Sequence, residues 1–174
     1  MYSRMYCRLA LLAGIVVALS GQALAEHPAP KELSGTIHDY LVTNGERWHV
    51  GGEWSLQLKG DGSTGDFSAM FIGVPRDNPP LFPISAAHTH FVSIVDGDVK
   101  VTHDVNGSLI LTLRGPGTFT GNGNLQSAYT GSEVEVTIRG GNTIPYSNFG
   151  MTISAPASEH YGDETFHGLV TRQR

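Results

Sequence analysis

The chain has 174 residues, a mean hydropathy of −0.10 and a single cysteine. Two of its eleven basic residues and none of its sixteen acidic residues fall in the first 25 positions, so the rest of the chain carries a net charge of −7. Its basic residues are scattered and form no stripe, which argues against nucleic acid or an anionic lipid surface as the main partner.

The first 25 residues have the pattern of a signal peptide. Arg4 and Arg8 precede an apolar run, Leu9–Leu19, and Ala23-Leu24-Ala25 is a typical cleavage site. Cleavage near Ala25 would remove the only cysteine, and the apolar run is short for a membrane span. We therefore predict a signal peptide over residues 1–25, a linker over 26–32 and one domain over 33–174. The protein would be periplasmic or secreted, without a stable membrane span after cleavage; an uncleaved N-terminal anchor is the alternative.

Short alternating segments separated by turn signals fill the rest of the chain. Val134, Val136 and Ile138, for example, alternate with polar residues, and no long amphipathic helical pattern occurs. The expected strands are Leu33–Val42, Glu46–Val50, Glu53–Lys59, Asp66–Val74, Ala87–Val95, Asp98–Val105, Ser108–Arg114, Gly117–Gly121, Glu133–Arg139, Tyr146–Ser154 and Glu164–Thr171. This pattern predicts an all-β domain. We favour a small closed antiparallel β-barrel, which has room inside for side chains or one small ligand, and keep a β-sandwich or jelly roll as the alternative.

The segment His88-Thr89-His90 is the strongest functional signal. Because alternate residues of a strand point the same way, its two histidines share a face. The pair Asp96-Gly97 favours a two-residue hairpin loop, which would place His90 opposite His103. A three-residue loop would reverse the parity and place His90 opposite Asp104. We prefer the two-residue loop because Asp-Gly suits its turn type.

In the preferred register three imidazoles converge, which is the ligand number of an open catalytic zinc site or a similar transition-metal site. The sequence thus predicts that His88, His90 and His103 hold one divalent ion, Zn²⁺, Fe²⁺ or Mn²⁺. The simpler interpretation is a set of polar-facing or core histidines bonded to the backbone. His160 and His167 could complete a site, but no sequence pattern places them near His88.

A second hairpin is expected at Asn106-Gly107. A three-residue loop there keeps one apolar face and sets His103 across from Leu109 and Val101 across from Leu111. His103 would then be buried or half-buried.

Several short motifs resemble known families. His88-Thr89-His90 followed by Val95-Asp96-Gly97-Asp98-Val99 resembles the first conserved segment of cupins, which implies a metal-binding pair. A His-x-His with a third histidine on the next antiparallel strand also resembles the metal site of carbonic anhydrases. Gly52-Glu53-Trp54 is similar to the Gly-x-Trp of lipocalins, and the whole chain is similar to small calycin-like or allene-oxide-cyclase-like barrels.

These observations leave three functional hypotheses. The first is an exported barrel that binds a small, mostly apolar ligand, with Trp54, Phe71 and Phe91 as candidate wall residues. The alternative is a cupin-like metal-dependent enzyme, and the second alternative is a structural or adhesion module. The sequence has no Gly-x-Ser-x-Gly elbow and no phosphate-binding loop, so common hydrolases and nucleotide enzymes are disfavoured. Whether the protein is an enzyme stays open.

Overall fold

The computed structural model describes residues 31–43, 45–76, 86–121, 129–140 and 148–174. In these ranges nine strands and one short helix, α1 (Ser158–Tyr161), follow one another. The strands are β1 (Glu32–Thr43), β2 (Glu46–Lys59), β3 (Thr64–Pro75), β4 (His88–His103), β5 (Leu109–Pro116), β6 (Thr118–Gly121), β7 (Glu133–Arg139), β8 (Asn148–Ile153) and β9 (Phe166–Gln173). The predicted signal peptide, most of the predicted linker and Tyr146 lie outside the described residues. Within the described ranges, no helix has the length and apolar character needed to cross a bilayer.

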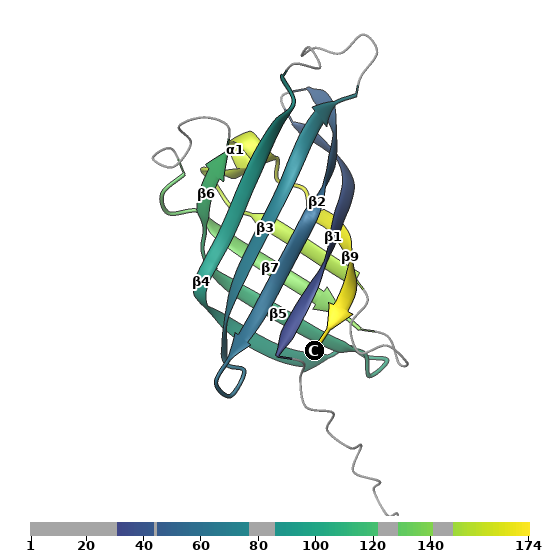
Figure 1. The fold of residues 1–174 in the computed structure, drawn as a ribbon, viewed down its shortest axis with the longest axis vertical. Helices are drawn as coiled ribbons and strands as arrows, with labels where there is room; N and C mark the ends of the chain where they lie inside the picture. Colours follow the sequence, from purple (N-terminus) through teal and green to yellow (C-terminus); the bar gives the residue numbers. More distant parts are fainter. Residues whose placement is uncertain (1–30, 44, 77–85, 122–128, 141–147) are drawn as a thin grey trace, which may run out of the picture.

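Antiparallel pairing closes the sheet into a barrel (Figure 1). Eight strands follow one another around the ring in the order β1, β2, β3, β4, β5, β7, β8 and β9, and β9 pairs back onto β1. The ninth strand, β6, pairs with the first half of β4, and β5 pairs with its second half. The predicted class, an all-β closed antiparallel barrel, is confirmed.

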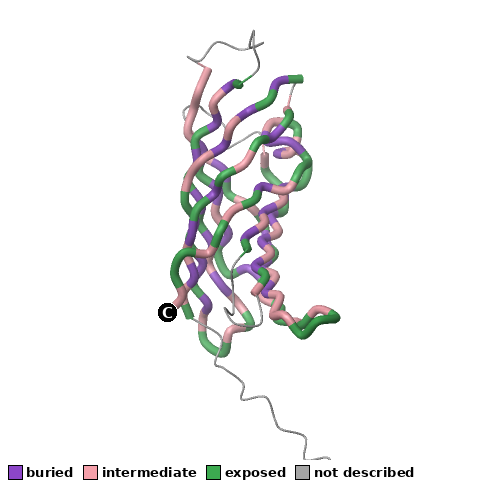
Figure 2. Tube along the Cα trace, turned by 90° about the vertical axis from the view of Figure 1, so that its right-hand side faces the viewer, coloured by how far each residue is buried: buried purple, intermediate pink, exposed green. Residues whose placement is uncertain are grey.

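Alternation gives each strand an inner and an outer face. On β7, Val134, Val136 and Ile138 are fully buried, whereas Glu133 and Arg139 are exposed. Figure 2 shows the same alternation of buried and exposed residues along the other strands. Removing each large apolar side chain from water contributes about 1.5–3 kcal/mol, so the packed interior is the main source of stability.

The hairpin predicted at Asp96-Gly97 is wrong. β4 is one continuous strand that pairs with β3 before this point and with β5 after it. The pairing with β3 shifts register between Gly65 and Phe67, as a β-bulge does. Asp96 has a φ of 53°, and its amide donates to the Asp66 carboxylate over 2.9 Å. The left-handed backbone conformation that Asp-Gly favours therefore forms part of a β-bulge here and not of a hairpin turn.

The predicted register of the next hairpin is confirmed. His103 pairs with Leu109 and Val101 with Leu111. The expected burial of His103 is wrong, because the tip of this hairpin projects into solvent and its Val105 is fully exposed. The two strands predicted over residues 46–50 and 53–59 are one strand, β2, which continues through Gly51-Gly52.

Candidate metal centre

Two histidines of the candidate site lie on β4. His88 and His90 point to the inner side of the barrel near the start of this strand, opposite Gly73 and Phe71 of β3. The ring of Phe71 lies 5.3 Å from that of His90, and the ring of Trp48 meets His88 edge-on at 5.7 Å. Aromatic packing therefore holds both imidazoles at one end of the barrel.

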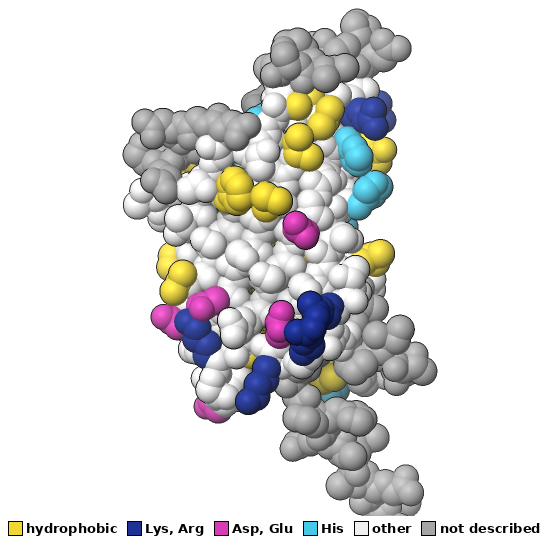
Figure 3. Space-filling model, viewed as in Figure 1, with side chains coloured by type: hydrophobic (Ala, Val, Ile, Leu, Met, Phe, Trp, Pro, Cys, Tyr) yellow, Lys and Arg dark blue, Asp and Glu magenta, His cyan; other side chains and the backbone are white. Residues whose placement is uncertain are grey.

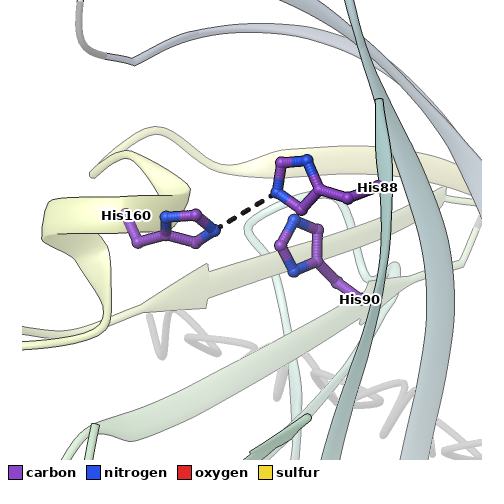
Figure 4. Close-up of side chains that lie close together, drawn as sticks. All are labelled: His88, His90 and His160. Atoms are coloured by element: carbon purple, nitrogen blue, oxygen red, sulfur yellow. Dashed lines mark hydrogen bonds between the residues drawn. The ribbon is translucent and has the colours of Figure 1, made fainter. Parts of the chain in front are cut away.

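The third histidine, His160, comes from α1, which connects β8 to β9. The helix packs on the barrel through Tyr161 and the preceding Ala157, which are both buried. The Ala157 amide donates to the hydroxyl of buried Ser132 over 2.9 Å, and the Thr43 hydroxyl donates to the His160 carbonyl over 3.3 Å. These contacts orient His160 toward the two β4 histidines (Figure 4).

The three imidazoles are close to metal-binding geometry. The Nε2 atoms of His88 and His160 are 3.5 Å apart, and one ring nitrogen from each histidine lies within 4.8 Å of the others. Two nitrogens bound tetrahedrally to zinc, each at about 2.1 Å, are about 3.4 Å apart. The His88–His160 pair already has this spacing, and His90 has to approach by at most about 1.4 Å. The cluster could therefore hold a metal ion.

His88 presents a nitrogen lone pair to the cluster. Its Nδ1 lies 2.6 Å from the carbonyl oxygen of Ala86. Because a carbonyl only accepts, Nδ1 carries a proton, which leaves Nε2, on the side of His160, as the nitrogen that can bind a metal. Metal-binding histidines commonly make this second bond, which fixes the tautomer and the ring orientation.

Burial keeps two of the three rings, His90 and His160, in the form that binds metal. Burial, together with the charges of His88 and His160, lowers the pKa of His90 to about 3. Burial and the neighbouring His88 also lower the pKa of His160. Both rings are therefore neutral at pH 7, and a neutral imidazole is the form that binds metal. No carboxylate is found among the described residues that line the site, so its candidate side-chain ligands are the three imidazole nitrogens.

Two buried polar atoms next to the cluster have no hydrogen-bond partner among the described residues. They are Nδ1 of His90 and the hydroxyl of Tyr161, and their rings lie 4.8 Å apart. An unsatisfied buried polar group costs about 1–3 kcal/mol. The pair is therefore suited to a polar ligand or to water held at the site.

A cavity of about 50 Å³ adjoins the three histidines. Apolar side chains from four strands form most of its wall: Leu41, Trp48, Val50, Phe71 and Phe166. Because one water needs about 10–15 Å³ of such space, the cavity has room for a ligand of only a few heavy atoms.

The structure does not bring His103 to the other predicted ligands. His103 ends β4 and lies thirteen positions after His90, which is about 43 Å of extended chain at 3.3 Å per position. Its predicted place opposite His90 depended on the hairpin that β4 does not form. His160 is the third histidine of the cluster instead. No local sequence signal connects the short helix that carries it, near the end of the chain, with β4.

The aromatic residues predicted to contact a ligand lie in three different places. Phe71 lines the cavity. Trp54 lies deeper in the barrel core, stacked on Phe149 with ring centroids 4.6 Å apart. Phe91 points outward and is 43% exposed.

His167, the other histidine left open by the sequence, does not join the cluster. It is exposed on β9, and its backbone amide and Nδ1 are each 2.7 Å from the Asp39 carboxylate.

Comparison of the chain with protein-family models, curated protein sequences and solved structures gives no significant match. The resemblances to cupins, carbonic anhydrases and lipocalins therefore rest on short motifs alone. Fold and site together define a closed eight-stranded antiparallel barrel with a three-histidine cluster at one end.

Proposed function

We propose that this protein binds one divalent transition-metal ion, Zn²⁺ in the first place, through His88, His90 and His160. The observation that carries the proposal is the state of His88. Its Nδ1 is engaged by the Ala86 carbonyl at 2.6 Å, so its Nε2 lone pair points at His160, 3.5 Å away. This is the arrangement that a zinc ligand and its supporting backbone bond adopt.

The donor set favours zinc among the metals considered. Imidazole nitrogens suit zinc, copper, iron and nickel, whereas manganese prefers oxygen ligands. Fe²⁺ is less well matched than zinc, because the common non-haem iron site adds a carboxylate to two histidines. The described lining of this site has no carboxylate.

A zinc ion with three protein ligands keeps a fourth position for an added ligand. Here that position would face a cavity of about 50 Å³ with apolar walls. A dication with only neutral ligands is costly in such surroundings, so a small anion such as hydroxide or a short carboxylate is the favoured fourth ligand. Burial raises the pKa of Tyr161, so its hydroxyl stays protonated and can donate a hydrogen bond to that ligand.

When bound, zinc would lower the pKa of a coordinated water to about 7 and so supply hydroxide for hydrolytic or hydration chemistry. An activity of this kind on a small substrate is part of the proposal.

A second candidate function is binding of a small apolar molecule at the same end of the barrel. The apolar wall formed by Leu41, Val50 and Phe166 favours it. The volume of the cavity restricts such a ligand to a few heavy atoms unless the barrel end opens. Export through the predicted signal peptide is compatible with both candidates.

Cobalt substitution tests the metal site. Co²⁺ bound by three imidazoles and one further ligand should give the intense visible absorption of a four-coordinate ion, and azide should shift it by entering the fourth position. His160→Ala should abolish the spectrum, whereas His103→Ala, which changes an exposed histidine at the far end of β4, should leave it intact. Equal spectra for both variants would refute the site. Failure of cobalt to bind while an apolar probe is retained would favour the second candidate, and binding of neither would favour a structural module.

A further inference from the structure

Two other histidines meet on the outer face of the barrel. In the antiparallel pair β1–β2, His38 lies opposite Gly51 and Tyr40 lies opposite His49. His38 and His49 are therefore diagonal neighbours on the outward face, and their Nε2 atoms are 3.3 Å apart. Figure 3 shows histidine side chains gathered on the upper half of the molecular surface.

The separation of the two nitrogens is that of two ligands on one metal ion. Bonds of about 2.0–2.1 Å at a tetrahedral angle place the nitrogens about 3.3–3.4 Å apart. Tyr40 supports this arrangement, because its ring stacks on His49 with centroids 5.1 Å apart and lies 6.4 Å from His38. For a tetragonal ion such as Cu²⁺, whose neighbouring ligands lie at right angles, the two nitrogens would be about 2.8–3.0 Å apart, so the rings have to approach by only about 0.3–0.5 Å.

Space for further ligands lies beside the pair. Gly51, opposite His38, has no side chain, and a Cβ atom built there would meet no atom within 4 Å. His38 is exposed, so water can reach the pair directly. An ion held by the two imidazoles would complete its coordination with water.

The neighbouring charges predict that His38 and His49 bind a divalent ion with only modest affinity. Burial, His38 and then the positive charge of Arg76 all lower the pKa of His49, so Arg76 acts on this ring and also repels a dication. The carboxylate on the same strand, Asp39, is bonded to His167 at 2.7 Å. The outer pair should therefore bind more weakly than three imidazoles in a buried cluster.

We infer that His38 and His49 form a second metal site, on the outside of the barrel, for a divalent ion that accepts two imidazoles and completes its shell with water. Cu²⁺ is the foremost candidate, because it binds nitrogen ligands most tightly among the divalent first-row ions. The site shares no residue with the inner cluster, so it does not depend on the function proposed for that cluster.

Copper titration of a variant in which His88, His90 and His160 are all changed to alanine isolates the outer pair. Isothermal titration should find one Cu²⁺ per chain bound by it, and electron paramagnetic resonance should show coupling to two imidazole nitrogens. His38→Gln and His49→Gln, each added to this background, should weaken binding by about tenfold or more, because the second imidazole no longer adds to the first. His103 is exposed and has no histidine beside it among the described residues. The control variant His103→Gln should therefore leave the copper affinity and the paramagnetic resonance spectrum unchanged.

Loss of copper affinity to the same extent in all three glutamine variants, or in none, would overturn the inference. Circular dichroism of each variant separates loss of the site from loss of the fold. The zinc content of His38→Gln, measured with the inner histidines intact, distinguishes the two sites. It should equal that of the wild type, because the zinc is held by the inner cluster and not by the outer pair.

Discussion

Zinc should raise the thermal stability of this protein by an amount that can be worked out in advance. A ligand that binds only the folded state at one hundred times its dissociation constant adds about 2.7 kcal/mol to the free energy of unfolding. For a chain of this length each kcal/mol moves the melting temperature by about 2–4 °C, so Tm should rise by about 5–10 °C. The rise follows from the three imidazoles that folding brings together at His88, His90 and His160.

Differential scanning calorimetry of the protein with zinc and with a chelator measures this rise. His160→Ala should melt at nearly the same temperature under both conditions, because loss of one of the three ligands weakens zinc binding at the inner cluster to the point where little zinc is held. His103→Ala, in which only an exposed side chain is shortened, should keep the full rise. The reasoning is refuted if zinc stabilises the His160→Ala variant as much as the wild type, or if it stabilises neither.

Three further predictions concern the barrel itself. Gly52→Ala should destabilise the fold by about 1–3 kcal/mol in urea denaturation, since its Cβ would lie 2.1 Å from a backbone oxygen of β3. Gly51→Ala, whose Cβ meets nothing within 4 Å, should change the same quantity by less than about 0.5 kcal/mol. Leu113→Ala, at a fully buried position, should cost about 2–5 kcal/mol in that assay. The hydrogen bond from Lys59 lowers the pKa of Asp66 below its ordinary 3.8. Its contribution to stability is therefore present above that pH and lost below it, and the Tm difference between wild type and Asp66→Asn should shrink from about pH 6 to pH 3.

Local patterns were enough to predict the fold class. The alternation on β7 and the turn residues around it predict strands with one buried face, and a chain made of such strands has to close on itself or stack in two layers. The predicted β4–β5 register is confirmed, and Gly107 has the positive φ, 81°, that the expected three-residue loop requires.

The course of β4 could not be predicted from the same patterns. Asp96-Gly97 supplies a positive φ, and both a tight hairpin and a β-bulge use that conformation. The choice depends on which strand lies alongside, and β3 pairs across the bulge from Asp98 to His88. This single difference moves His103 away from the predicted site.

The third histidine of the cluster could not be predicted either. His88 and His90 are recognisable because strand alternation is a short-range property. His160 reaches them only after the barrel has closed through β9 and α1 has packed over its end, 70 residues further along the chain. Contacts set by barrel closure leave no local pattern.

The metal content of the purified protein tests the central claim most directly. The protein is prepared without chelator and without a metal-affinity tag, and its zinc, iron, manganese and copper are measured by elemental analysis. The account predicts about one zinc per chain in the wild type and in His103→Ala, and none in His160→Ala. Absence of bound metal from the wild type even after reconstitution, or equal zinc in His160→Ala, would contradict it.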